Sequence, residues 1–171
     1  MAKRSEKADK ATAVMVSLRR IVRFLRLADR EVEAACEISA AQLFVLDSLI
    51  ADSAASVTEL ARRTLTDQSS VSTVVARLVE RGLVKRTPSR TDRRRAELTI
   101  TAAGERMVKR APRVPQAAMI TAIRDMPPDR RAELTRALEG LATAIGADEV
   151  APRMLFEDEP SPKPARRRSR R

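Results

Sequence analysis

Residues 67–87 read DQSSVSTVVARLVERGLVKRT and place an amphipathic helix directly before a β-prone segment. Asp67 is an N-cap residue, and Gly82 supplies a stop signal for the helix between them. Apolar residues recur at helical spacing on one face, namely Val71, Val74, Val75 and Leu78. The opposite face carries small polar side chains in the first half of the helix. The helix is therefore expected to bury one face and to expose the other.

Two capping boxes upstream predict two further helices. Ser39 with Gln42 opens a segment that runs to about Ala51, and Ser56 with Glu59 opens a shorter one. The helix described above is then the third in a row, and its apolar face is expected to pack on the preceding helix. Two helices joined by a short turn in this way are typical of a helix-turn-helix.

Downstream the hydrophobic period changes to that of strands. Residues 83–87 and 96–100 are β-prone, and the polar stretch 88–95 between them predicts a β-hairpin. Segment 85–97 carries six basic and two acidic side chains, a charge of +4. Its basic residues are Lys85, Arg86, Arg90, Arg93, Arg94 and Arg95. We therefore expect a mainly α-helical fold with a small β-hairpin wing beside a helix-turn-helix.

An N-terminal helix is expected before this core. Residues 14–32 carry a regular apolar seam flanked by arginines, whereas residues 1–10 lack periodicity and are expected to be frayed. The seam is wider than a lone surface helix needs, so it suits either a core helix or one that also pairs with a second subunit. Its candidate pairing residues are Val14, Leu18, Ile21 and Leu25.

Helices are also expected after the hairpin. Pro112 and Pro115 are expected to break a helix that starts at about residue 102, after which it resumes. A last helix over 129–145 repeats the apolar seam with Leu134, Leu138, Leu141 and Ile145. Amphipathic helices are therefore expected on both sides of the winged core.

The chain divides into four expected parts. These are an N-terminal tail and dimerisation helix over 1–38, a winged helix-turn-helix core over 39–101, C-terminal dimerisation helices over 102–150 and a disordered basic tail over 151–171. The last nine residues, 163–171, hold six basic side chains and no acid. Such an arm either adds salt-sensitive phosphate contacts or has little effect, and both interpretations are open.

The composition excludes most enzyme classes. The 171 residues contain no His and one Cys, which excludes a catalytic triad and a four-ligand zinc site. The four glycines are too far apart for a phosphate-binding loop, and no apolar run is long enough to span a membrane. The net charge of +11 favours a polyanionic partner. We expect a cytoplasmic, nucleoid-associated protein without catalytic residues, cofactor or metal.

The polar face of the third helix suits the major groove of double-stranded DNA. Gln pairs with adenine, Ser and Thr serve donors or acceptors on several bases, and an Arg in a narrow wing fits the minor groove. The candidate helix contacts are Gln68, Ser69, Ser70, Ser72 and Thr73. Polar helix faces and solvated basic turns are common separately, so their combination is what favours DNA.

Five motifs occur here in a specific order and spacing. They are Ser39-Ala40-Ala41-Gln42, Thr58-Glu59-Leu60-Ala61-Arg62-Arg63, Asp67-Gln68-Ser69-Ser70-Val71-Ser72, Arg77-Leu78-Val79-Glu80-Arg81-Gly82-Leu83-Val84-Lys85-Arg86, and Asp92-Arg93-Arg94 followed by Thr101 and Gly104. With them, residues 39–104 resemble the winged-helix core of the MarR family of bacterial transcriptional regulators. The flanking helices agree only in position and character.

The resemblance implies a homodimer, formed by the first helix and the last two, on a pseudo-palindromic operator. It implies that residues 67–80 enter the major groove and 88–95 the adjacent minor groove. It adds Arg77 to the recognition helix, makes Arg94 the wing-tip arginine and gives Asp92 the role of fixing the wing. Such proteins usually repress transcription, and many release DNA when a small, often phenolic, anionic effector binds.

Three features depart from that pattern. Thr64 and Leu65 occupy the turn before the recognition helix, where Gly is common, and the two prolines interrupt what is normally one long dimerisation helix. The scarcity of aromatic residues argues against a conventional phenol pocket.

Some similar proteins sense oxidants through a Cys in the first helix, but Cys36 has no Tyr, His or basic neighbour, so an inert thiol is favoured.

Two other functions are compatible with a winged helix. One is a protein–protein interaction module whose basic wing docks on an acidic partner. The other is a nucleoid-type, non-specific DNA binder driven by the tail. Base-sized polar residues over 67–73 favour sequence-specific DNA binding over the first, and deletion of 163–171 distinguishes it from the second.

Overall fold

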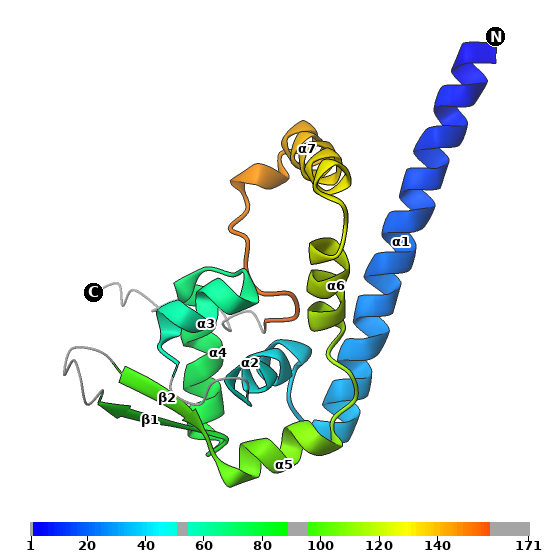
Figure 1. Ribbon diagram of the computed structural model, residues 1–171. Coiled ribbons are helices and arrows are strands. Elements are labelled where there is room, and N and C mark those ends of the chain that lie inside the picture. Colours follow the sequence, from blue (N-terminus) through cyan, green and yellow to red (C-terminus); the bar gives the residue numbers. More distant parts are fainter. Residues whose placement is uncertain (1, 51–54, 89–95, 158–171) are drawn as a thin grey trace, which may run out of the picture.

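The computed structural model describes residues 2–50, 55–88 and 96–157, with side chains from residue 10 onward. Within these ranges the chain is mainly helical and has one two-stranded sheet (Figure 1). The elements are α1 (Ala2–Cys36), α2 (Ala40–Ile50), α3 (Val57–Thr64), α4 (Gln68–Glu80), β1 (Val84–Pro88), β2 (Ala96–Ile100), α5 (Ala102–Arg110), α6 (Pro115–Arg124), α7 (Pro128–Ala144) and the 3₁₀ turn η1 (Ala147–Glu149). The expected mainly α fold with a β-hairpin wing and a helix-turn-helix is confirmed.

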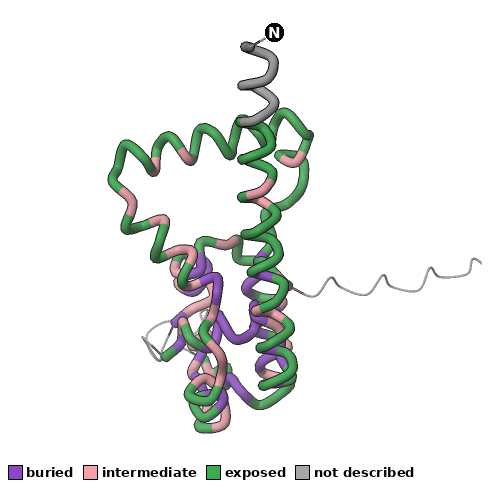
Figure 2. Tube along the Cα trace, turned by 90° about the vertical axis from the view of Figure 1, so that its right-hand side faces the viewer, coloured by how far each residue is buried: buried purple, intermediate pink, exposed green. Residues whose placement is uncertain are grey.

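Helix α2 lies at the centre of the core, where it contacts α1, α3, α4, α5, α6 and β2. Its apolar residues are aliphatic apart from Phe44, and Leu43, Leu46 and Leu49 have no exposed surface. Burial of such a side chain contributes about 1.5–3 kcal/mol to folding. The buried residues gather in the half of the molecule farthest from the N-terminus (Figure 2). This half holds the helix-turn-helix.

Local hydrogen bonds start three helices where the sequence predicts them. The Ser39 hydroxyl accepts from the Gln42 N–H at 3.3 Å, and the Ser39 N–H donates to Gln42 Oε1 at 3.0 Å. This reciprocal pair is a complete capping box. The side chains of Ser56 and Asp67 cap α3 and α4 by accepting from a backbone N–H three residues later. The predicted starts of α2, α3 and α4 are thus confirmed.

The hairpin is fixed at its base to the helix-turn-helix. Strands β1 and β2 pair in antiparallel fashion over all five of their residues. The Leu98 N–H donates to the Ala55 carbonyl at 2.9 Å, which ties β2 to the segment before α3. The Thr101 hydroxyl donates to the Gly82 carbonyl, also at 2.9 Å. These bonds hold the wing in a set position relative to α3 and α4.

The expected break at the prolines is present between α5 and α6. Helix α5 ends at Arg110, and α6 starts with Pro115 in its first turn, where the missing N–H costs no helical hydrogen bond. The chain turns between the two helices. Helix α6 runs alongside α1, and α5 lies below α6 in the view of Figure 1.

Both ends of the chain differ from the expectation. Helix α1 starts at Ala2, so residues 2–10 are helical rather than frayed. Seven of these nine residues are Lys, Ala, Arg or Glu, which favour helix even without an apolar seam. Residues 151–157 are not a disordered tail, because Met154 is buried in the core. The rest of the expected tail, 158–171, lies outside the described residues, and the four-part division of the chain stays a prediction.

Candidate nucleic-acid interface

Helix α4 has one face in the core and one face at the surface. Its buried apolar residues, which lie where α4 contacts α2 and α3, are Val71, Val74, Val75 and Leu78. Of the predicted recognition residues, Gln68, Ser69 and Ser72 are exposed, and Thr73 and Arg77 are half-buried. The exposed face therefore presents small and amide side chains on a helix whose position is set by the core.

Ser70 differs from the other predicted recognition residues. Its side chain is only 3% exposed. Residues four apart share a helix face, and Ser70 lies one turn before the buried Val74. A buried hydroxyl cannot reach a base edge, so this burial argues against the predicted DNA contact at Ser70. The other recognition residues stay predictions.

The turn that leads into α4 is closed by backbone geometry and a carboxylate. Leu65 has φ 53° and ψ 42°, in the left-handed region, and its N–H donates to the Ala61 carbonyl. Asp67 Oδ1 accepts from the Ser70 N–H at 2.9 Å, and this hydrogen bond holds the pKa of Asp67 below its ordinary value. The Asp67 carboxylate already caps the N-terminus of α4. DNA contacts are therefore expected from the side chains of α4 rather than from the backbone N–H groups at its start.

Helix α3 carries a charged cluster beside this turn. Glu59 accepts from Arg62 Nη2 at 2.7 Å and from Arg63 Nε at 2.8 Å, and these side-chain hydrogen bonds, Arg62 first, lower the pKa of Glu59 to about 2. Arg63 also donates to the Ser48 carbonyl at 3.3 Å, which ties α3 to α2.

The side chain of Arg62 remains 75% exposed in spite of its ion pair. It lines a groove of about 510 Å³ at the α3–α4 turn together with Gln68. A positive side chain beside the exposed end of α4 is a candidate phosphate contact that the sequence reasoning missed. Its place in the Thr58–Arg63 motif, directly before the turn, is the signal that would have found it.

The wing is described only at its base. Lys85 and Arg86 are exposed on β1, whereas the preceding Val84 is buried. Basic side chains therefore extend the polar surface of α4 toward the hairpin. The other predicted wing residues, Arg90, Asp92, Arg93, Arg94 and Arg95, lie outside the described residues.

Residues 37–95, which span α2, α3, α4 and β1, match the model of the MarR family. This part of the chain is similar to the winged helix-turn-helix domain of the MarR family. It has the fold of that family of transcriptional regulators. No curated protein sequence matches the chain.

Solved structures extend the likeness beyond residues 37–95. BldR from Sulfolobus solfataricus is 22% identical with a TM-score of 0.53, over 82% of this chain and 98% of that one. YusO from Bacillus subtilis is 24% identical with a TM-score of 0.50, over 80% and 96% of the two chains. BpsR from Bordetella bronchiseptica, whose DNA binding is regulated by 6-hydroxynicotinic acid, is 27% identical with a TM-score of 0.52, over 75% and 92%.

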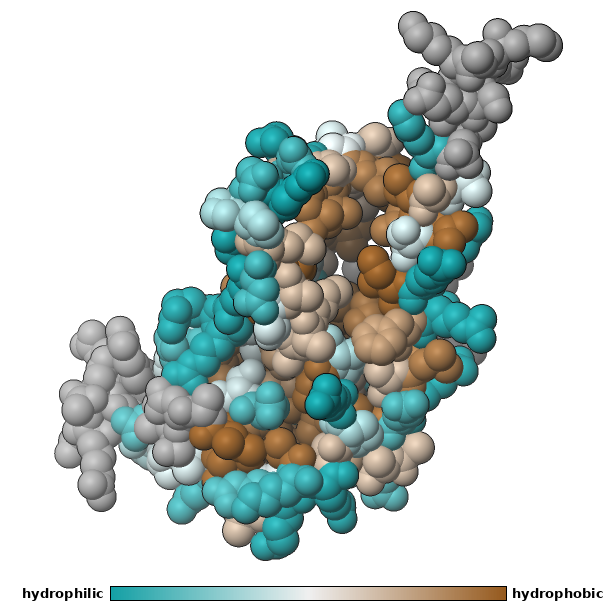
Figure 3. Space-filling view, turned by 45° about the vertical axis from the view of Figure 1, so that its right-hand side comes forward, coloured by the Kyte–Doolittle hydropathy of each residue, from teal (hydrophilic) through white to brown (hydrophobic). Residues whose placement is uncertain are grey.

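Outside its winged helix, the chain exposes apolar side chains on α1 and α7. Helix α7 has no buried residue at all. Of the predicted dimerisation residues, Val14, Ile21, Leu138, Leu141 and Ile145 are exposed, and Leu18 and Leu134 are half-buried. Apolar surface faces the hollow between the upper parts of α1 and α7 (Figure 3).

Leu25 differs from the other predicted dimerisation residues because it is only 7% exposed. It lines an apolar cavity of about 440 Å³ between α1 and α6, with Phe24, Pro115 and Met119 among its neighbours. Its burial within one chain argues against a direct role in pairing. The periodicity of α1 identified its apolar residues but not which of them α6 covers.

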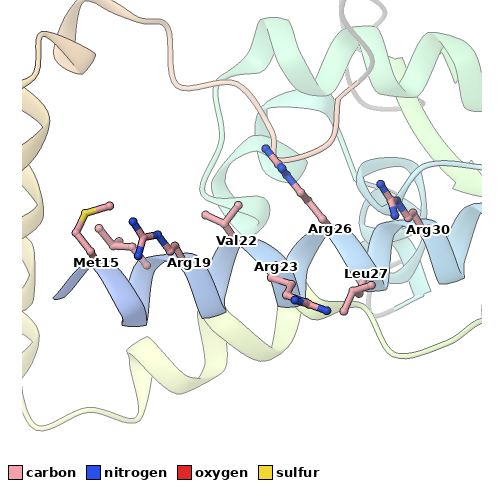
Figure 4. A pocket seen from close by; sticks show the side chains of 8 residues that line it. Met15, Arg19, Val22, Arg23, Arg26, Leu27 and Arg30 are labelled. Carbon is pink, nitrogen blue, oxygen red and sulfur yellow. The ribbon is translucent and has the colours of Figure 1, made fainter. Parts of the chain in front are cut away.

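A groove of about 570 Å³ follows another face of α1 (Figure 4). It combines apolar side chains with four arginines: Met15, Leu18, Val22, Leu27, Arg19, Arg23, Arg26 and Arg30. All eight belong to one helix, so the described residues supply only one wall of this groove. The buried Cys36 lies farther along α1, outside this groove.

Two kinds of feature are absent from the residues that the structure describes. No helix there is long and apolar enough to cross a membrane. No three His, Cys, Asp or Glu side chains in the same ranges gather in a way that could hold a metal ion.

Proposed function

We propose that this MarR-family protein is a homodimeric, sequence-specific DNA-binding repressor of transcription. The observation that carries the proposal is the two-sided α4. Its apolar face is buried, and its exposed face presents Gln68, Ser69 and Ser72 within the segment that matches the family model. Amide and hydroxyl groups in this position suit hydrogen bonding to base edges in the major groove.

Basic residues on both sides of α4 support DNA as the partner. Arg62 is exposed at the α3–α4 turn, and Lys85 and Arg86 are exposed on β1. Positive side chains in these places bind phosphates and set the register of the recognition helix on the duplex. The sequence adds the predicted wing arginines, of which Arg94 is assigned to the minor groove by the family pattern.

The apolar surfaces of α1 and α7 support a dimer. Soluble chains rarely leave this much apolar side chain exposed without a partner. A twofold dimer presents two copies of α4, and we propose that they read a pseudo-palindromic operator with half-sites about one helical turn apart. Repression then follows where the operator overlaps a promoter.

A small-molecule effector is the final part of the proposal. The α1 groove combines apolar side chains with arginines, which suits an amphipathic carboxylic acid. BpsR, which is 27% identical, has its DNA binding regulated by such an aromatic acid, 6-hydroxynicotinic acid. We propose an aromatic carboxylic acid as the effector class, seated between this groove and a second wall supplied by the dimer partner.

The experiment is a selection of DNA fragments from the source genome, bound by the purified full chain with and without aromatic carboxylic acids. We expect one recurring pseudo-palindromic sequence, fewer recovered fragments in the presence of an effector, and less transcript in vitro from a promoter that carries the site. Recovery of fragments without a shared sequence contradicts the proposal.

Two variants then test the interface on the selected operator. Gln68→Ala is expected to weaken binding by about 1–3 kcal/mol, the usual value of a good base contact. Arg93→Ala/Arg94→Ala is expected to weaken it by at least as much, because groove and phosphate contacts are both lost. The matched control is Arg136→Ala, an exposed residue on the side of α7 opposite its leucines and far from the hairpin (Figure 1). Full affinity of the Arg93/Arg94 variant rules out the winged-helix mechanism.

A further inference from the structure

The C-terminal end of α1 meets the ends of two helices of the winged core. Glu37, the residue directly after α1, has φ 56°, and its N–H donates to the Glu33 carbonyl at 2.8 Å. This left-handed residue turns the chain out of α1 and toward α2, which starts at Ala40. Ile38, between the two helices, is 2% exposed, so the turn is fixed on the core.

Two long-range hydrogen bonds join this turn to the helices around it. The Asp29 carboxylate on α1 accepts from the Ala40 N–H at 2.9 Å, which holds the start of α2 against α1. The Arg81 guanidinium donates to the Glu37 carbonyl, and Arg81 is the C-cap residue of α4. The recognition helix is therefore linked to the end of α1 through the residue that caps it.

Polar groups surround the place where α1 and α4 approach each other. Between the ends of the two helices lies a groove of about 400 Å³, lined by Asp29 and Glu33 on α1 and by Arg77 and Glu80 on α4. Helix α2 contacts both α1 and α4, so the two are also connected through it. Because open space separates the helix ends, side-chain packing there leaves room for α1 to tilt. The bond from Arg81 restrains such a tilt.

The length of α1 amplifies any change of its angle to the core. The helix extends well beyond the helix-turn-helix (Figure 1). From the exposed Val14 to Cys36 at its end, α1 measures about 33 Å at 1.5 Å per residue. A tilt of about 6° at this end therefore moves Val14 by about 3.5 Å, close to the rise of one base pair of DNA.

In a dimer that pairs through α1, the angle between α1 and α4 in each subunit sets the distance between the two copies of α4. Moving one operator half-site by one base pair shifts it by about 3.4 Å and turns it by about 34° around the duplex. A fixed angle in both subunits resists such a change, so it favours a single spacing of the half-sites.

We propose that Arg81 is a positioning residue for DNA recognition. By binding the Glu37 carbonyl it fixes the angle between α1 and the recognition helix, and it thereby determines which half-site spacing the dimer prefers. The inference rests on the proposed function, because it takes α1 as a pairing helix and α4 as the helix that reads the operator.

A direct phosphate contact is the competing role for Arg81, because its side chain is basic and exposed. The two roles have different consequences. Loss of a phosphate contact weakens binding equally at every half-site spacing and makes the slope of log affinity against log salt shallower by about 0.9 for each contact. Loss of a positioning bond changes the relative affinities for different spacings and leaves the salt slope as it was.

The first test measures binding by fluorescence anisotropy to the selected operator and to duplexes whose half-sites are one base pair closer together or farther apart. We expect the natural chain to bind the shifted duplexes at least about ten-fold more weakly, because the DNA has to deform to fit. Arg81→Ala is expected to lose about three- to ten-fold at the natural spacing, since fewer subunits then hold the productive angle. Its further loss at the shifted spacings is expected to be at most about three-fold, because a released α1 adapts to them.

Two further variants separate the hydrogen bond from the charge. Arg81→Lys keeps the positive charge but replaces the planar guanidinium by a flexible ammonium, so its spacing profile is expected to lie between those of the natural chain and Arg81→Ala. The matched control is Arg136→Ala, which removes an exposed arginine from α7 and should keep the natural profile. Circular dichroism at the assay temperature checks that each variant is folded.

The second test needs no DNA. Nitroxide labels on Ala13→Cys in α1 and Ala76→Cys in α4, both exposed positions, report the distance between the two helices by pulsed electron paramagnetic resonance. The labels are placed in a Cys36→Ala background, and an excess of unlabelled chain restricts the signal to pairs within one subunit. We expect one narrow distance distribution with the natural Arg81, and a distribution shifted or broadened by about 3–4 Å with Arg81→Ala, as the length of α1 implies.

Three outcomes overturn the inference. They are an equal loss of affinity at every spacing in Arg81→Ala, a shallower salt slope with an unchanged spacing profile, which assigns Arg81 to the phosphates, or an unchanged distance distribution. A failure of the proposed function looks different, because the natural chain itself then binds operator and mixed-sequence duplexes equally or shows no preferred spacing. In that case the role in spacing is refuted with it, and the distance distribution decides whether Arg81 fixes the angle between α1 and α4.

Discussion

Leu65 has a left-handed backbone conformation, which suits Gly better. It lies in the turn that leads into the recognition helix α4. Its φ of 53° costs an L-residue about 1–2 kcal/mol relative to ordinary helical geometry. Gly has no such cost but loses about 0.5–1 kcal/mol more in conformational entropy on folding. Because the Leu65 side chain is 64% exposed, little burial is lost with it. The residues around Leu65, rather than Leu65 itself, therefore stabilise this turn.

We expect Gly to be more stable than Ala at this position, by about 1 kcal/mol in the free energy of unfolding. Leu65→Gly and Leu65→Ala are compared by urea denaturation with the natural chain. The control is the same pair at Arg136, an exposed site inside α7, where Ala is expected to be the better residue by about 1 kcal/mol. If Ala is also favoured at 65, the left-handed geometry of this turn is contradicted.

At the scale of single elements, the junction of the hairpin with α5 leaves no room for a side chain at Gly104. A Cβ on Gly104 lies 2.5 Å from the Leu83 carbonyl oxygen and 2.7 Å from Ile100 Cγ1. That carbonyl also accepts from the Thr101 N–H at 3.0 Å, so it cannot move freely. The absence of a side chain at 104 therefore sets how closely α5 approaches the wing.

Gly104→Ala is expected to lower the free energy of unfolding by about 1–3 kcal/mol, the usual cost of overpacking. Gly140→Ala is the matched control, because a Cβ there meets nothing within 4 Å and α7 gains helix propensity of up to about 1 kcal/mol. Thermal unfolding of both variants checks the opposite signs. A neutral Gly104→Ala contradicts the close approach of α5 to the hairpin.

The elements were predictable from the sequence wherever a local interaction starts or stops them. The Ser39 box, the Asp67 cap and Pro115 each act within a few residues, so their helix boundaries follow from the sequence. Burial by a distant part of the chain leaves no local pattern. Leu25 is covered by α6 and Met154 is buried in the core, and the sequence predicted neither.

The candidate site shows the same division. The exposed polar face of α4 followed from periodicity, whereas the burial of Ser70 depends on how closely α4 packs on the core. Arg62, which donates to Glu59, was missed because the sequence reasoning used Glu59 only as the capping-box partner of Ser56. Its exposure depends on the turn that brings α3 next to α4, which is a tertiary feature.

At the scale of the whole molecule, polar and apolar surfaces lie at different ends, and α1 connects them. Its C-terminal end packs against α2, and the Arg81 guanidinium at the end of α4 donates to the Glu37 carbonyl just beyond it. Its other half exposes Val14, Ile21 and further apolar side chains. Any ligand or partner that shifts α1 therefore acts on the position of α4.

This arrangement makes the dimer testable without disturbing the winged helix. Helix α7 has no buried residue within the chain, so charged substitutions there leave the core intact. Leu138 and Leu141 are 47% and 38% exposed on its apolar face. In a dimer these side chains are expected to be covered, and burial of an unpaired carboxylate in their place costs far more than the lost apolar contact.

We therefore expect Leu138→Glu/Leu141→Glu to raise the dimer dissociation constant by at least about a hundred-fold, close to 3 kcal/mol. Sedimentation velocity over a range of concentrations measures it, and circular dichroism checks that the chain stays helical. Thr143→Glu is the control, because this exposed residue lies on the opposite side of α7 and should leave the dimer unchanged. A natural chain that sediments as a monomer, or a double variant that still dimerises, contradicts α7 as the pairing surface. Operator binding by the monomeric variant should weaken steeply, because two linked recognition helices bind far more tightly than one.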